Sequence, residues 1–381
     1  MSQTSRLVWL ETPLILSNHL SSLLDCNVYL KLENLQPSQS FKYRGISLFA
    51  THCKATRGDN VHLIIASGGN AGLAAACAAN SLGLKCTVYL PKGNNQSMVD
   101  RLQKEKAEVV VVGKYYSEAA QEAQKAVERN ENACYVHGYD GPILSKGHSS
   151  MITEISHQLH EKPDAIFCSV GGGGLLKGII DGCKYVDWDD VPIVAVETHG
   201  AAAFYHSMSL NESWGANCSL PAGSSQTYND EHNISIANVR ITSKASSLAA
   251  TSPSTSVVHA GLRRLGSVTC ITIPDEMAMH TTCMFAEDHK FLAELACSAT
   301  LSLAYHPDLF ERIQTANITK RNQSNENKKT VVFIVCGGVK VSLDEVQEYE
   351  ALVRGESCKS PAWEVFCNGK RLSVMKRPTS V

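Results

Sequence analysis

Three glycine-rich turns are the first parts of this sequence that could do chemistry. They cover residues 67–72 (SGGNAG), 171–174 (GGGG) and 336–338 (CGG), and each follows a short apolar run. In open parallel sheets, ligands bind where the strands end at their carboxyl side. Glycine lets the backbone approach a ligand closely, and the next helix offers its N-terminal N–H groups to an anion. A single glycine-rich turn between a strand and a helix is as often purely structural as ligand-binding. Three such turns together predict a phosphate site.

The spacing of these glycines argues against a nucleotide site. A dinucleotide-binding turn reads G-x-G-x-x-G, and a nucleoside triphosphate loop continues into Gly-Lys-Ser/Thr. Neither pattern occurs at the three turns. The phosphate that we expect at the tetraglycine run therefore belongs to another kind of ligand.

Lys42 lies in the run 40–45 (SFKYRG) and carries an amine that could act as a nucleophile or base. Most lysines are surface residues, because lysine is rarely buried. A catalytic amine must be desolvated or lie beside another cation, so that its neutral form exists near neutral pH. Phe41 and Arg44 meet part of that demand. By spacing alone, a surface lysine stays the open alternative.

Alternating strand and helix patterns would position these turns. Apolar runs predict strands at 28–32, 63–66, 86–90, 109–112, 165–170 and 193–196, with the last strand at 331–335. Helical patterns lie at 71–82, 117–129 and, as one long stretch, about 275–305. Continuous apolar strands alternating with helices indicate parallel sheets that are covered on both faces. Polar runs predict surface loops at 211–233 and 315–329, and the basic tail beyond about 356 is expected to be irregular.

Composition excludes several classes of function. The chain has 381 residues, a formal net charge of −2 and no long block of like charges. It therefore lacks the basic footprint of a nucleic-acid or anionic-membrane partner. We find neither a secretory signal nor an apolar run long enough to span a membrane. The 14 cysteines form no Cys-x-x-Cys pair and lie in apolar stretches, so we expect reduced core residues and a cytoplasmic rather than a mitochondrial protein.

Taken in order, these runs resemble the fold-type II pyridoxal 5′-phosphate (PLP) enzymes, and most of all the L-serine/L-threonine dehydratases. The likeness extends from about residue 9 to 350 and includes 31–37 (KLENLQP), 196–198 (VET) and 294–297 (ELAC). It implies an α/β fold of two doubly wound, mostly parallel open-sheet domains, similar to the tryptophan synthase β-subunit. It also implies a catalytic body over 1–350, with a C-terminal extension over 351–381. The small domain would lie at about 45–145, and the large domain would combine 1–44 with 146–350.

The resemblance also implies site residues. Lys42 would hold PLP as a Schiff base and act as the catalytic base, and Phe41 and Ser247 would face the two sides of the pyridine ring. Asn70 would bind the 3′-oxygen, and the thiol of Cys336 would face the ring nitrogen. The phosphate would be bound by Gly171, Gly172, Gly173 and Gly174. The substrate carboxylate would be bound by Ser67, Gly68, Gly69 and Ala71.

Two further expectations follow from the resemblance. Glu197, with the backbone of Ala201, would bind a monovalent cation such as K⁺, although a strand-end surface carboxylate is the open alternative. The chain would form a homodimer and act on a small amino acid, with no nucleic-acid or membrane partner.

The activity implied is conversion of L-serine to pyruvate and ammonia, and of L-threonine to 2-oxobutanoate and ammonia. A β-replacement enzyme, such as a cysteine or cystathionine synthase, would normally have serine or threonine at position 336. A serine racemase would have an acidic divalent-cation site a few residues after Glu197. Residues 198–207 contain no carboxylate, which argues against a racemase. The departures Leu295, Ser298 and Lys340 leave open a PLP-binding protein without turnover. The stretch after residue 350 is too short for the regulatory domain of biosynthetic threonine deaminases, so we expect a catabolic role.

Overall fold

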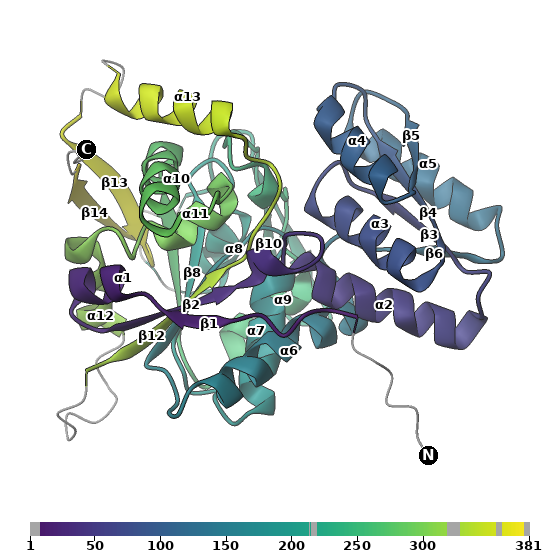
Figure 1. The fold of residues 1–381 in the computed structure, drawn as a ribbon. Coiled ribbons are helices and arrows are strands. Elements are labelled where there is room, and N and C mark those ends of the chain that lie inside the picture. Colours follow the sequence, from purple (N-terminus) through teal and green to yellow (C-terminus); the bar gives the residue numbers. More distant parts are fainter. Residues whose placement is uncertain (1–7, 213, 215–218, 318–327, 356–359, 377–381) are drawn as a thin grey trace.

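The computed structural model describes residues 8–212, 214, 219–317, 328–355 and 360–376. Its strands form an eight-stranded sheet, a four-stranded sheet and a two-stranded hairpin. Figure 1 shows the four-stranded sheet and its helices beside the larger body, with α2 (Lys42–Arg57) reaching from that body beneath them. No helix in the described ranges is both long and apolar enough to cross a membrane.

The eight-stranded sheet has the order β1-β2-β12-β7-β8-β11-β13-β14. The five strands from β2 to β11 pair in parallel, and β1, β13 and β14 are antiparallel additions at the two edges. Its strands are β1 (Leu14–Leu16), β2 (Asn27–Leu32), β7 (Ala165–Ser169), β8 (Ile193–Thr198), β11 (Val268–Ile273), β12 (Thr330–Val335), β13 (Ala362–Cys367) and β14 (Lys370–Met375). The four-stranded sheet is wholly parallel, in the order β5-β4-β3-β6. Its strands are β3 (His62–Ala66), β4 (Lys85–Leu90), β5 (Glu108–Val111) and β6 (Ala133–Tyr135).

Helices cover both faces of the larger sheet, with α10 and α11 on one side and α6 and α7 on the other (Figure 1). In the smaller unit, α3 packs against α2, and α2 also packs against α6, so α2 joins the two parts. The described helices besides α2 are α1 (Asn18–Leu24), α3 (Asn70–Leu82), α4 (Gln96–Lys104), α5 (Tyr116–Glu128), α6 (Pro142–Gln158), α7 (Gly174–Tyr185), α8 (Ala203–Asn211), α9 (Thr255–Arg263), α10 (Asp275–His289), α11 (Leu295–Leu301), α12 (Pro307–Asn317) and α13 (Leu343–Arg354). Two short 3-10 turns are η1 (Glu33–Leu35) and η2 (Ser246–Leu248).

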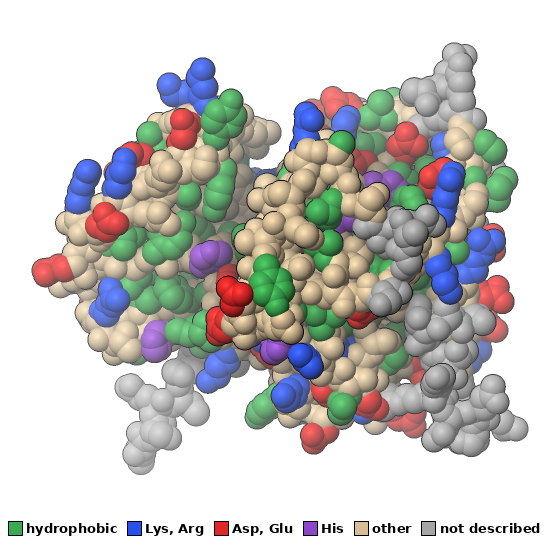
Figure 2. Space-filling model, turned by 180° about the vertical axis from the view of Figure 1, so that it is seen from behind, with side chains coloured by type: hydrophobic (Ala, Val, Ile, Leu, Met, Phe, Trp, Pro, Cys, Tyr) green, Lys and Arg blue, Asp and Glu red, His purple; other side chains and the backbone are tan. Residues whose placement is uncertain are grey.

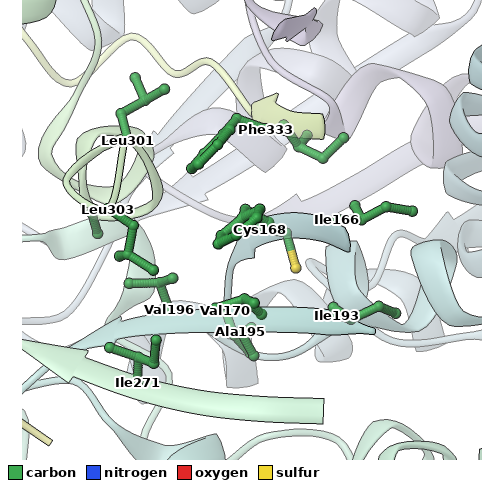
Figure 3. Packing of buried hydrophobic residues seen from close by; sticks show 14 of the residues in the cluster. Ile166, Cys168, Val170, Ile193, Ala195, Val196, Ile271, Leu301, Leu303 and Phe333 are labelled. Atoms are coloured by element: carbon green, nitrogen blue, oxygen red, sulfur yellow. The ribbon is translucent and has the colours of Figure 1, made fainter. Parts of the chain in front are cut away.

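Apolar strands make the core of the larger sheet. The side chains of β7, β8 and β12 are buried on both faces, as expected of covered parallel strands. Phe167 stacks on Phe333 with ring centroids 4.2 Å apart, and Leu301 and Leu303 pack nearby from α11 and the turn after it (Figure 3). This packing fixes the carboxyl ends of the central strands, where the glycine turns begin.

The structure confirms the predicted fold class and each predicted strand, and it corrects four details. The stretch 275–305 is not one helix, because the chain leaves helical geometry at Lys290 (φ 58°) between α10 and α11. Residues 211–233 are not all loop, since β9 (Ser225–Asn229) pairs with β10 (Ile234–Asn238). The strand at 331–335 is not the last, and the tail is not irregular throughout, because β13 and β14 extend the sheet beyond it. The predicted loop at 315–329 lies mostly outside the described residues.

The cysteines of the described ranges are free, and all but Cys283 are buried, as predicted. Lysine, arginine and acidic side chains are interspersed on the face seen in Figure 2, with no basic patch. The boundaries at residues 45, 145 and 350 stay a prediction, although the four-stranded sheet falls between the first two.

Candidate active site

Lys42 begins α2, and its backbone is held beside the end of β12. Ser40 forms a β-bridge with Gly337, and the N–H of Phe41 donates to the carbonyl of Cys336 at 3.0 Å. The side chain of Lys42 is half-buried, and its Nζ donates to the carbonyl of Gly138. Burial lowers the pKa of Lys42 from 10.5 to about 8, against a smaller upward effect of Cys336 and Glu294. The amine can therefore be neutral near physiological pH.

The tetraglycine run forms a tight turn between β7 and α7. Gly173 has a φ of 97°, which a residue with a Cβ rarely adopts. A Cβ on Gly172 would lie 2.4 Å from the ring of Tyr139, and one on Gly174 would lie 2.5 Å from the Tyr139 carbonyl oxygen. Side chains are thus excluded here, and α7 directs its first N–H groups toward the turn.

The residues expected around the cofactor ring lie around one small cavity. Its walls include Phe41, Lys42, Asn70, Ser247, Cys336 and the four glycines at 171–174. These residues come from five separate parts of the sequence, so the cavity is made by the fold and not by any one motif.

Cys336 follows the last residue of β12 and is buried. Its Sγ lies 3.5 Å from the Oγ of Ser169. The neighbouring thiol of Cys297 and burial raise the pKa of Cys336 well above its ordinary value. Position 336 therefore presents a neutral thiol to the cavity.

Asn70 is the first residue of α3 and makes three hydrogen bonds within the protein. Its Nδ2 donates to Glu294 Oε1 at 2.9 Å and to Ser247 Oγ at 3.2 Å, and its Oδ1 accepts from the N–H of Val339 at 3.0 Å. Burial raises the pKa of Glu294. The amide expected to contact the cofactor is thus held in place by three separate segments.

The expected substrate loop lies in a second pocket, which also contains Lys42. Ser67, Gly68, Gly69 and Ala71 line it. A Cβ on Gly68 would lie 2.1 Å from Oδ1 of Asn94, and one on Gly69 would lie 2.7 Å from Cε of Lys340. Glycine at both positions therefore lets this loop pack closely against Asn94 and Lys340.

Glu197 and Ala201 lie away from these pockets. Both oxygens of Glu197 accept backbone N–H groups at the start of α8, from Phe204 at 3.0 Å and Tyr205 at 2.6 Å. The carboxyl group is buried, which raises its pKa to about 8, so it is not a surface carboxylate. Ala201 forms a bridge with Thr198. In the part of the chain that the structure describes, no three His, Cys, Asp or Glu residues form a cluster that could hold a metal ion.

Sequence reasoning did not place Tyr139, Glu294 or His148 in the site. Tyr139 lines the cofactor cavity, and Glu294 anchors Asn70. His148 is buried beneath Phe41, with ring centroids 5.0 Å apart, and burial lowers its pKa well below the ordinary value. The run 294–297 could have pointed to Glu294, but no sequence signal marks the other two.

Comparisons with known proteins agree with this geometry. A family described as "Pyridoxal-phosphate dependent enzyme" matches residues 6–337. A human protein named serine dehydratase-like is 37% identical over 338 residues, which cover 88% of this chain and 92% of that protein. Human L-serine dehydratase/L-threonine deaminase is 34% identical over 342 residues, covering 88% and 93%. The crystal structure of an L-serine ammonia-lyase from the fungus Rhizomucor miehei superposes with a TM-score of 0.75 at 32% identity, covering 90% of this chain and 98% of the other.

Proposed function

The chain belongs to the pyridoxal-phosphate dependent enzyme family, and we propose that it is an ammonia-lyase that converts L-serine to pyruvate and ammonia. L-Threonine would give 2-oxobutanoate and ammonia by the same steps. The observation that carries the proposal is the desolvated amine of Lys42 in one cavity with the tetraglycine turn and a neutral thiol.

The residues present fit pyridoxal 5′-phosphate. Glycines at 172 and 174 let the turn pack closely against Tyr139, and the N-terminus of α7 beside it could bind a phosphate. Lys42 lies across the same cavity, where an amine can condense with an aldehyde. Phe41 and Ser247, which also line it, would face the two sides of the ring.

When bound, PLP supplies the electron sink that lets the Cα–H bond of an amino acid break. The protein then has to move protons and hold the substrate. Lys42 is suited to take the Cα proton, because burial brings its pKa to about 8. The carbonyl of Gly138 accepts a hydrogen bond from Nζ and would hold the protonated amine close to the substrate. The hydroxyl group then leaves the β-carbon as water.

Cys336 supports elimination over racemisation. Its thiol stays neutral, because Cys297 and burial raise its pKa. A neutral thiol cannot hold a proton on the ring nitrogen as a carboxylate would. The ring is then a weaker electron sink, which favours loss of the β-hydroxyl over reprotonation at Cα.

Two of the three residues that depart from the family pattern do not line the proposed substrate pocket. Leu295 and Ser298 are buried in α11, and the Oγ of Ser298 accepts from Thr282 Oγ1 at 2.8 Å. Only Lys340 lines the proposed substrate pocket. These positions therefore give little support to a PLP-binding protein without turnover. A β-replacement enzyme is disfavoured because it would normally have serine or threonine at position 336.

A coupled assay tests the proposal. Purified protein loaded with PLP should be yellow and should produce pyruvate from L-serine, detected with lactate dehydrogenase. Lys42→Ala should lose both properties, whereas Lys104→Ala, at an exposed position of α4, should keep them. A yellow wild type that makes no keto acid from either amino acid would contradict the lyase and favour a binding protein.

We further propose that Glu197 and the carbonyl of Ala201 bind a monovalent cation such as K⁺. Burial raises the pKa of Glu197 to about 8, so a bound cation would stabilise its ionised form. Activity should then be higher in K⁺ than in tetramethylammonium at equal ionic strength, and Glu197→Gln should remove the difference. Equal activity in both salts would contradict the cation site.

The homodimer and the cytoplasmic location are also proposals. The family resemblance supports the dimer, and the buried free cysteines suit a reducing compartment. Light scattering at several concentrations would test the first, and fractionation of the source cells would test the second.

A further inference from the structure

Lys340 stands in the wall of the proposed substrate pocket, and its backbone is anchored there. It follows the turn after β12, where Gly338 has a φ of 134°. The N–H of Lys340 donates to Glu294 Oε2 at 3.1 Å, and its Nζ donates to the Oγ of Ser246 at 3.2 Å. Both contacts fix the direction of the side chain.

The side chain of Lys340 lies against Gly69 of the substrate loop. A Cβ on Gly69 would be 2.7 Å from Cε and 3.1 Å from Nζ of Lys340, so any larger residue would displace the lysine. The ammonium group is therefore held a few ångströms from the backbone expected to bind the substrate carboxylate.

The charged residues that line this pocket are all cationic. Among all the residues that line it, only Lys42 and Lys340 carry a formal charge, and neither Asp nor Glu is present. Lys42 would be bonded to the cofactor. The Nζ of Lys340 donates to a neutral hydroxyl. Glu294, which does not line the pocket, also interacts with the charge of Lys340, but burial raises the pKa of that carboxyl group.

The cofactor phosphate is not that anion. The cavity that all four glycines line contains Lys42 but not Lys340, and only Gly172 of the turn also lines the pocket of Lys340. Lys340 instead shares its pocket with Ser67, Gly68 and Gly69. The anion that reaches this side is part of the substrate.

We propose that Lys340 binds the α-carboxylate of the amino-acid substrate and makes that carboxylate a requirement for binding. The proposal rests on the proposed function, since it takes the amino acid as the ligand. Lys340 would be a specificity-determining residue, with no part in the movement of protons.

Calorimetry of the PLP-loaded protein tests this without turnover. L-Alanine has no β-leaving group and serves as the carboxylate probe, and L-alaninamide is the matched probe without a carboxylate. Lys340→Met should weaken L-alanine about 10- to 100-fold, because hydrogen bonds to charged groups contribute about 1.5–3 kcal/mol. The affinity for L-alaninamide should stay within about twofold, since that probe offers no anion to the ammonium.

Controls separate charge from structure. Lys340→Arg should retain most of the affinity for L-alanine, and Lys244→Met, which removes a cation outside this pocket, should change neither probe. Lys340→Gln, which keeps a polar group near Ser246, should behave as Lys340→Met. The KM for L-serine should rise by the same factor as the L-alanine constant, with kcat nearly unchanged.

Either of two results would overturn the inference: no change for L-alanine, or an equal loss for both probes. A wild type that binds L-alanine but makes no pyruvate would instead contradict the proposed lyase, so the two failures are distinguishable.

Discussion

Two clusters of charged and polar side chains each include a residue of α2, and they differ in how completely their charges are paired. The inner ion cluster consists of Lys31, Glu33, Arg44 and Glu154. The active-site cluster consists of Lys42, Asn70, Glu294 and Lys340. Lys42 and Arg44 are two residues apart on α2, yet one belongs to each cluster.

In the inner ion cluster, every charge meets an opposite charge. Arg44 donates to both oxygens of Glu33 at 2.7 Å and to Glu154 at 2.5 and 2.7 Å, and Lys31 donates to Glu154 at 2.6 Å. Burial alone would raise the pKa of Glu33, but Arg44 brings it below the ordinary value. Such a cluster joins β2, η1, α2 and α6 and has no capacity left for a ligand.

In the active-site cluster, the charges lack matched partners. Burial lowers the pKa of Lys42 to about 8 and raises that of Glu294. The ammonium of Lys340 bonds to a hydroxyl. The contrast teaches that the same residue types stabilise the fold where their hydrogen bonds are complete, and remain available for chemistry where they are not.

Breaking the inner ion cluster should have the largest effect on stability. Arg44→Met leaves Glu33 and Glu154 buried without their guanidinium, and should lower the free energy of unfolding by about 3–5 kcal/mol. Urea denaturation followed by circular dichroism measures this. Lys328→Ala, which removes an exposed ion pair with Asp25, should leave the midpoint unchanged. An equal, small shift for both variants would show that the cluster is not a stabilising centre.

A Cβ in the phosphate turn should disturb the cofactor and not the fold. Gly172→Ala brings a Cβ to 2.4 Å from the Tyr139 ring and should weaken PLP binding about 10- to 100-fold, since overpacking costs about 1–3 kcal/mol. Titration of the apoprotein with PLP measures the constant. Gly261→Ala in α9, where the nearest atom would be 3.4 Å away, is the matched control. Unchanged affinity in Gly172→Ala would place the phosphate elsewhere.

The depressed pKa of Lys42 predicts a pH dependence. Only the neutral amine attacks the aldehyde of PLP, so its attachment rate to the apoprotein should rise about tenfold per unit below pH 8 and level off above it. Between about 8 and 10.5 the unfolded chain binds more protons at this residue, so Lys42 contributes stability that grows as pH rises through that window and is lost as pH falls. Stopped-flow absorbance measures the rate. A midpoint near 10.5 would mean that Lys42 is solvated.

Cys336→Ser should have the smallest effect. A hydroxyl is as neutral as the thiol of Cys336, so kcat for pyruvate formation should change by no more than about threefold. The ratio of elimination to α-proton exchange, followed by NMR in deuterated water, should stay the same. A large shift toward exchange would show that the sulfur itself, and not its neutrality, directs the reaction.

Much of the fold could be predicted from sequence. Parallel strands buried on both faces are apolar throughout, which made 165–170, 193–196 and 331–335 recognisable. The hairpin of β13 and β14 was missed because the tail was interpreted from its basic composition, and because β14 buries only one side chain, that of Val374. The break at Lys290 was missed because the helical pattern continues on both sides of it.

The candidate site was predictable at Asn70 and Cys336, where a glycine turn follows a strand, and at Lys42 only through the family resemblance. It was not predictable where the partner is distant in sequence, as for Glu294 with Asn70 or Glu154 with Lys31, which are 224 and 123 residues apart. Those contacts exist only after the two sheets and α2 have packed together. The roles of the site residues and the cation at Glu197 stay predictions.

Trapping the cofactor on the chain tests the central claim most directly. Borohydride reduction of the PLP-loaded protein fixes an imine as a stable secondary amine, and peptide mass spectrometry then locates it. We predict that the label is on Lys42, that Lys42→Ala carries none, and that the reduced wild type no longer makes pyruvate from L-serine. A label on another lysine, or an active protein after stoichiometric reduction at Lys42, would contradict the account.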